Sequence, residues 1–157
     1  MKKAPIVCLA LILCDDVIED VRTHKKSFLN SFNSIIVPTI PTNHPQFCVV
    51  CSITDAQKAN LAISIKKDDT QKKIMEVRGQ VSIENPLDVV DIVFTFRQIP
   101  LNEIGSYSVE ITSEGEYIAS RRFTVQAMQS KEKGNSWICR REPARYDSND
   151  KSIFFLL

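Results

Sequence analysis

Apolar and polar residues alternate along most of the chain up to about Val125, in short runs separated by turn-forming residues. A strand points successive side chains to opposite faces, so each run predicts a strand with one buried and one solvated face. An unbroken apolar stretch at the start and Phe32–Val37 predict two more strands. The alternating runs are Phe47–Thr54, Asn60–Lys67, Ile74–Ile83, Val89–Ile99, Tyr107–Thr112 and Tyr117–Val125.

The apolar stretch from Ala4 to Cys14 follows two lysines, which is how a secretion signal begins. The cleavage sites have the wrong shape: Ala10 leaves too short an apolar stretch before it, and the large Leu13 precedes Cys14 where a lipoprotein site needs a small residue. Acidic residues then end the stretch abruptly. We therefore expect a retained first strand, apolar on both faces, in a cytoplasmic protein with reduced thiols.

No segment of helical period is long enough to supply a crossover helix between parallel strands, and "HKKSFLNS" (His24–Ser31) predicts at most a single helical turn. The fold class predicted is therefore all-β: an antiparallel sandwich of about eight strands with Greek-key, immunoglobulin-like character. Residues 1–126 form this domain. Residues 127–157 are polar and non-periodic, and we expect a tail that is docked or partly disordered.

One local motif is more specific. "NEIGSYSVEI" (Asn102–Ile111) places Gly105 shortly before Tyr107 at the start of a strand. It resembles the tyrosine corner of immunoglobulin-like sandwiches, in which the ring packs and the hydroxyl bonds a nearby backbone group. Val109 stands where antibody domains have a cysteine, which excludes a disulfide-bonded antibody-type domain. In the later turn "SEGE", Gly115 is expected to take a positive φ.

A larger pattern joins these segments. "LILCDDV", "SFNSIIVPTIPTNHPQFCVV", "FRQIPLNEIGSYSVEI" and "ASRRFTV" together resemble a family of small bacterial β-sandwich proteins known only as a domain of unknown function. The resemblance covers roughly Val7–Val125. It implies a sandwich fold, and it brings no catalytic residues to transfer.

Composition and charge exclude several functions. Hydrophobic residues make up 43% and charged residues 25% of the 157, which is typical of a soluble globular protein. The net charge of +1 supplies no field that gathers nucleic acid or anionic lipid, and no apolar run reaches the ~20 residues of a membrane-spanning helix. With four glycines, the chain has no phosphate-cradling loop or dinucleotide fingerprint. We expect no cofactor and no enzymatic activity.

Five cysteines are present: Cys8, Cys14, Cys48, Cys51 and Cys139. The Cys48–Cys51 spacing is that of a redox or zinc pair, but on a strand two residues three apart point to opposite faces. We therefore interpret both as small hydrophobic residues. A zinc site would need His24, His44 or Cys139 as further ligands, at no recognised spacing.

Four carboxylates follow the first strand: Asp15, Asp16, Glu19 and Asp20. Carboxylate oxygens bind divalent cations, so a metal site, if the chain has one, is expected here, and a metal-dependent hydrolase is the rival function. That hydrolase would need a catalytic histidine, and His24 is the one close in sequence. The simpler interpretation is a solvated turn after a buried strand.

Two further segments are candidates for contacting partners. His44 lies in a proline-rich stretch (Pro38–Phe47) that predicts a stiff, extended connection or an edge that a partner contacts. Arg140, Arg141 and Arg145, near Trp137 and Tyr146, suggest a weak nucleic-acid binder, although nearby acidic residues dilute the patch.

The last segment is the least ordinary part of the tail, since it groups Ile153, Phe154, Phe155, Leu156 and Leu157. Five large apolar residues are costly to leave in water, so we expect the segment to lie against this chain's own sheet or against a partner. The function predicted is a non-enzymatic binding or assembly module that uses a sheet edge, a loop end or this tail. For such a module we expect a protein partner or self-association.

Overall fold

A computed structural model describes residues 6–55, 58–85 and 87–128. Nine strands lie within them, and no helix there is long and apolar enough to cross a membrane. The strands are β1 (Val7–Glu19), β2 (Lys26–Ser31), β3 (Ser34–Val37), β4 (Thr42–Thr54), β5 (Lys58–Lys67), β6 (Lys73–Ser82), β7 (Val90–Leu101), β8 (Gly105–Ser113) and β9 (Glu116–Ala127).

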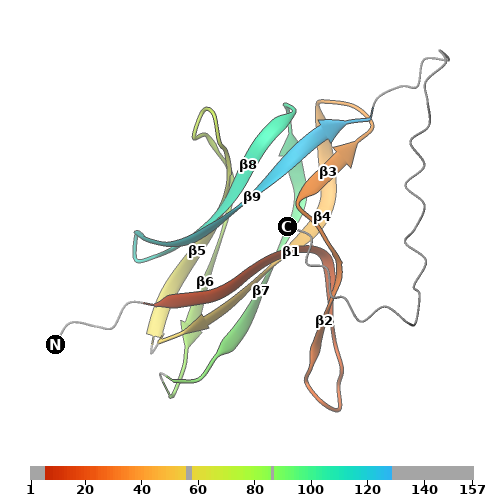
Figure 1. Cartoon of the computed structure of the whole chain (residues 1–157). Coiled ribbons are helices and arrows are strands. Elements are labelled where there is room, and N and C mark those ends of the chain that lie inside the picture. The colour runs from red at the N-terminus through yellow and green to blue at the C-terminus, as the bar shows by residue number, and fades with distance from the viewer. Residues whose placement is uncertain (1–5, 56–57, 86, 129–157) are drawn as a thin grey trace, which may run out of the picture.

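The strands form two sheets that pack face to face (Figure 1). One sheet has the order β2-β1-β4-β7 and the other the order β3-β9-β8-β5-β6. The predicted all-β sandwich is confirmed. Apolar residues on the facing sides of both sheets, spaced two apart along each strand, are what holds such a sandwich together.

Three details of the strand predictions are wrong. β2 was expected to be at most a helical turn, but its pairing with β1, from Cys14 opposite Ser31 to Glu19 opposite Lys26, makes it a strand. β1 does not end at Cys14, because the same pairing carries it on to Glu19. β3 lies parallel to β9 instead of antiparallel, because the chain crosses from one sheet to the edge of the other after β2.

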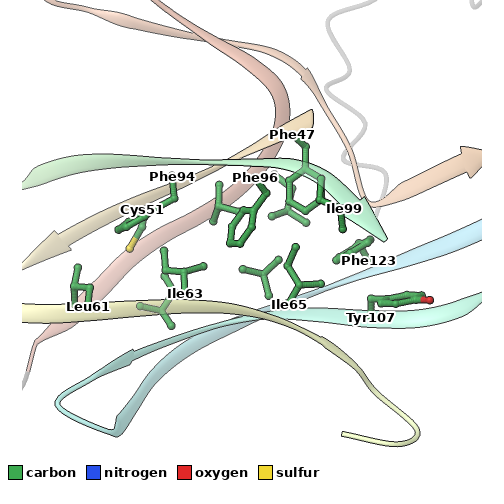
Figure 2. Packing of buried hydrophobic residues seen from close by; sticks show 14 of the residues in the cluster. Phe47, Cys51, Leu61, Ile63, Ile65, Phe94, Phe96, Ile99, Tyr107 and Phe123 are labelled. Atoms are coloured by element: carbon green, nitrogen blue, oxygen red, sulfur yellow. The ribbon is translucent and has the colours of Figure 1, made fainter. Parts of the chain in front are cut away.

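Most aromatic rings gather at one end of the core, whereas Phe94 lies near Cys51, and isoleucines and leucines from both sheets fill the rest (Figure 2). The Phe47 ring lies 5.8 Å from the rings of Phe96 and Phe123, and the Tyr107 ring stacks on Phe123 at 5.6 Å. Burying each such side chain contributes ~1.5–3 kcal/mol, and aromatic pairs add ~0.5–1.5 kcal/mol. The core is thus the main source of stability.

The two cysteines of β4 face opposite ways, as the strand period predicts. Cys51 points into the core between the sheets (Figure 2), where its sulfur lies 3.9 Å from that of Cys8. Cys48 lies on the other face of the same sheet, with Cys14. The four cysteines within the described residues are free thiols, and burial raises the pKa of Cys51, with a further contribution from Cys8.

The expected contact of Tyr107 is present. Its hydroxyl donates a hydrogen bond of 2.6 Å to the backbone carbonyl of Glu103, while its ring is buried. Gly105 has a φ of +124°, and a Cβ there would lie 3.0 Å from Nζ of Lys67. Glycine is therefore required by the backbone conformation, whereas Nζ of Lys67, which lies over the Tyr107 ring, is the end of a flexible side chain that can shift away from a Cβ. Gly115 also takes the positive φ predicted for it, at +86°.

A partly buried polar network, centred on Asp68, fastens the β5–β6 turn to β8 and β9. Asp68 accepts hydrogen bonds from the hydroxyl of Ser106 and, at 2.8 Å, from Nε of Arg122. Burial raises the pKa of the Asp68 carboxyl, but hydrogen bonds from Ser106 and Ser108 and the charge of Arg122 outweigh it, so the pKa is lowered. Asp68 is therefore more readily ionised in the folded protein than in the unfolded chain, and its ionised form stabilises the folded state.

We predict that Tyr107→Phe lowers the free energy of unfolding by ~1 kcal/mol, because one buried hydrogen bond is lost. Tyr107→Ala should lower it by ~3 kcal/mol or more, because it also leaves a cavity. Chemical denaturation measures both. Tyr117→Phe is the matched control: its hydroxyl pairs with that of Ser120 on the surface, so the change should stay within ~0.5 kcal/mol. Equal stability of wild type and the alanine variant would contradict the structural role of Tyr107.

We further predict that Asp68→Asn destabilises the protein at neutral pH by ~1–3 kcal/mol, the usual range for hydrogen bonds to a charged group. The folded pKa of Asp68 lies below its ordinary value of 3.8, so its stabilisation is complete above that pH and is lost as the pH falls through the folded pKa. The stability difference between wild type and variant should therefore shrink on acidification below about pH 4. Denaturation curves at several pH values test this, with the exposed Glu116→Gln as control. A difference that is independent of pH would refute it.

Candidate functional site: the β1–β2 ribbon

Beyond Cys14, β1 and β2 leave the sheet together as a two-stranded ribbon, residues 15–31. β1 pairs with β4 from Val7 to Cys14, and from Cys14 to Glu19 it pairs with β2. Figure 1 shows this ribbon extending away from the two packed sheets. Within the described residues, no further strand pairs with either outer edge of the ribbon. Both edges therefore present backbone groups to a neighbour.

The turn at the ribbon's tip is held by Asp20. Its carboxylate accepts hydrogen bonds from the backbone N–H groups of Arg22, at 2.8 Å, and Thr23, at 3.2 Å. Backbone bonds of 2.8 and 2.9 Å join Asp20 to His24 and Lys25. His24 has a φ of +55°, the left-handed conformation for which glycine is the default residue. The aspartate thus closes the hairpin without a glycine.

The predicted acidic cluster lies on this ribbon, but its carboxylates serve different partners. Asp15 accepts a hydrogen bond of 3.0 Å from Asn30 across the ribbon, and Asp16 accepts one from the N–H of Val17. Glu19 lies 3.0 Å from the His24 ring and 3.8 Å from Nζ of Lys26.

The hydrogen bond from His24, followed by the charge of Lys26, lowers the pKa of Glu19. Among the described residues, no three histidine, cysteine or acidic side chains are grouped to hold a metal ion. Within the described residues, the contacts of these carboxylates stabilise the conformation of the ribbon.

Exposed apolar side chains lie on both faces of the ribbon, a feature that the sequence analysis missed. Ile18 is 53% exposed, Phe28 37% and Leu29 39%, and Val21 at the tip is also exposed. Phe28 lies opposite Val17 on one face, and Leu29 lies opposite Asp16 on the other. The adjacent Phe-Leu pair in "KSFLNS" (Lys26–Ser31) could have indicated this exposure. Neighbouring residues on a strand point to opposite faces, so one of the two has to lie on each face of the ribbon.

His44 belongs to a strand and not to a connecting loop. It lies in β4 opposite Ile99 of β7, half-buried, with its ring 6.1 Å from that of Phe47. The predicted extended connection is therefore wrong in this part, because pairing with β7 carries β4 back to Thr42. The other predicted contact residues, Ile153–Leu157 and the arginine-rich segment, lie outside the described residues.

A shallow groove of about 840 Å³ lies across β5, β6 and β8. Its charged lining is paired internally: Glu76 bonds Lys73 and lies 2.7 Å from Nε of Arg78, while Glu114 accepts a hydrogen bond from Asn60. Its described lining contains no cysteine and no histidine, the side chains that most often act as nucleophile and general base. The ribbon remains the stronger candidate site.

Comparison with known proteins places the chain by family. No curated protein matches it. Solved structures similar to it include the sensor domain of the anti-sigma factor RsgI4 of Pseudobacteroides cellulosolvens, which is 11% identical, with 81% of this chain and 100% of that chain covered. The TM-score of 0.37 is too low to carry any conclusion about function.

A family model matches residues 9–126, most of the chain and nearly all of the sandwich. Its description is a family of unknown function, DUF6941. The sequence resemblance to a domain of unknown function is confirmed, and the chain belongs to the family DUF6941.

Proposed function

We propose that this protein is a non-enzymatic binding or assembly module whose contact surface is the β1–β2 ribbon. The observation that carries the proposal is the exposure of Ile18, Phe28 and Leu29 on a projecting ribbon with open edges. An isolated two-stranded ribbon is marginally stable in water. A partner that covers these side chains removes apolar surface from water and steadies the ribbon at the same time.

The open edges indicate how such a partner is held. A strand added to β2 gains backbone hydrogen bonds, and side chains spaced two apart supply specificity. The ribbon also carries both signs of charge, with Glu19 and Asp20 near Arg22 and Lys26. Charges at the edge of a contact orient a partner and disfavour wrong ones.

The rival function, a metal-dependent hydrolase, gains no support from the ribbon. A hydrolytic metal site needs several ligands directed at one point. Asp15, Asp16 and Glu19 instead bond Asn30, a backbone N–H group, and His24 with Lys26. The ordering of a hairpin explains these contacts.

The test compares a ribbon variant with a matched control in capture experiments from the native host. Ile18→Asp with Leu29→Asp places charges on two exposed apolar ribbon positions, and Leu87→Asp with Val89→Asp does the same in the β6–β7 connection. Losing two buried apolar contacts should weaken binding by at least about tenfold. Quantitative mass spectrometry should therefore find proteins that wild type and control retain and that the ribbon variant loses.

Thermal unfolding must first show that both variants remain folded. Elution volume with light scattering then separates self-association from capture of another protein, since a dimer held by the ribbon would become a monomer in the ribbon variant. Identical captured proteins and identical size for all three forms would refute the proposed contact surface.

A further inference from the structure

A second apolar cluster lies on the outer face of the four-stranded sheet, separate from the core. Cys14, Cys48 and Val50 form its centre, at 0%, 2% and 1% exposure. Half-buried Ile12, Val17 and Val93 pack around them. We refer to these six residues as the outer apolar face.

Strand pairing fixes which way this cluster points. Val50 lies between Ile12 of β1 and Val93 of β7, and neighbouring Val49 belongs to the core on the other side. The five-stranded sheet packs against that core side. Within residues 6–55, 58–85 and 87–128, no strand is layered over the outer apolar face.

The outer apolar face is chemically unlike the exterior of an ordinary sandwich. The solvent-facing residues of a half-buried strand are normally polar, whereas three neighbouring strands here contribute valine, isoleucine or cysteine. Burial, followed by the proximity of Cys48 and of the carboxylates of Asp15 and Asp16, raises the pKa of the Cys14 thiol. The three central side chains are shielded from water although no described strand is layered over them, so an apolar cover other than those strands accounts for their burial.

We propose that the outer apolar face is the docking site of Ile153–Leu157 of the same chain. This segment offers one isoleucine, two phenylalanines and two leucines, large apolar side chains of the kind that packs on a face of cysteine and valine. Lys151 precedes it and matches the carboxylates of Asp15 and Asp16 beside Cys14.

The length of the intervening chain allows this docking. Met128 is the last described residue, and its N–H donates to the carbonyl of Val37 at the edge of the other sheet. Residues 129–152 number 24 by their positions in the sequence, enough to span up to ~80 Å when extended and ~27 Å on average as a flexible coil. A domain of this size has a radius of gyration of only ~14 Å. A tether of this length also keeps the segment at a high local concentration, of millimolar order.

The cysteines of the outer apolar face provide the test. In the full chain, Cys14 and Cys48 should react slowly with N-ethylmaleimide, as measured by peptide mapping. Phe154→Asp with Phe155→Asp should raise both labelling rates by at least about tenfold, because a charged segment leaves the face and water enters. Cys51 lies in the core on the other side of the sheet, so its rate should not change.

Lys131→Asp with Lys133→Asp is the control, because it alters the charge of the tail and leaves the apolar segment intact. A second variant lacks Ile153–Leu157, and a synthetic peptide of Lys151–Leu157 is added back to it. The peptide should restore slow labelling of Cys14 and Cys48.

The other outcomes overturn the proposal. Fast labelling of Cys14 and Cys48 in the wild type, or rates unchanged by both variants, would show that the segment does not cover the face. An equal acceleration at Cys51 would show that the variants act through the whole fold. Protection that disappears on dilution would assign the cover to a second copy of the chain. None of these measurements involves the ribbon's partner. A negative result here would therefore refute the docking site and leave the proposed function untouched.

Discussion

β4 is apolar on both faces from Phe47 to Cys51, and the rest of the structure is arranged around that strand. Its inner face supplies Phe47, Val49 and Cys51 to the core, while Cys48 and Val50 form the centre of the outer cluster. β1 and β7 pair with it on its two sides. A strand that is apolar on both faces has to lie in the middle of a sheet, because at an edge its backbone and one apolar flank would meet water.

The point where β1 parts from β4 determines where the ribbon begins. The pairing ends with Cys14 opposite Cys48, and the next residues of β1 are two aspartates, which are unfavourable on either face of a buried sheet. β1 therefore continues with β2, whose own side chains are mostly exposed. The acidic residues thus have a structural effect: they turn a core strand into a projecting one.

The sequence predicted local features well and pairing between distant segments poorly. Alternation revealed most strands, and the Tyr107 contact was predictable because donor and acceptor are four residues apart. β2 was missed because its state depends on β1, and no periodicity encodes that pairing. The parallel pairing of β3 with β9 joins residues such as Ser34 and Thr124, which no local pattern connects. The ribbon's exposure was hidden for the same reason, since it depends on where β4 stops pairing with β1.

The two proposed contact surfaces meet at one pair of residues. Val17 belongs to the outer apolar face, and Phe28, which is exposed on the ribbon, lies directly opposite it on the same face of the β1–β2 pair. A segment seated over Cys14 and Cys48 would reach Val17, whose pairing partner Phe28 is a contact residue of the proposed ribbon surface. Two ligands that touch the same side chain alter each other's binding, and the coupling is reciprocal. If the docked segment packs beside Phe28 and leaves its contact surface free, it strengthens binding of the ribbon's partner. If it covers Phe28, it weakens that binding by competition. Because Val17 packs against the Cys14–Cys48 cluster and is paired with Phe28, this coupling needs no movement of the core.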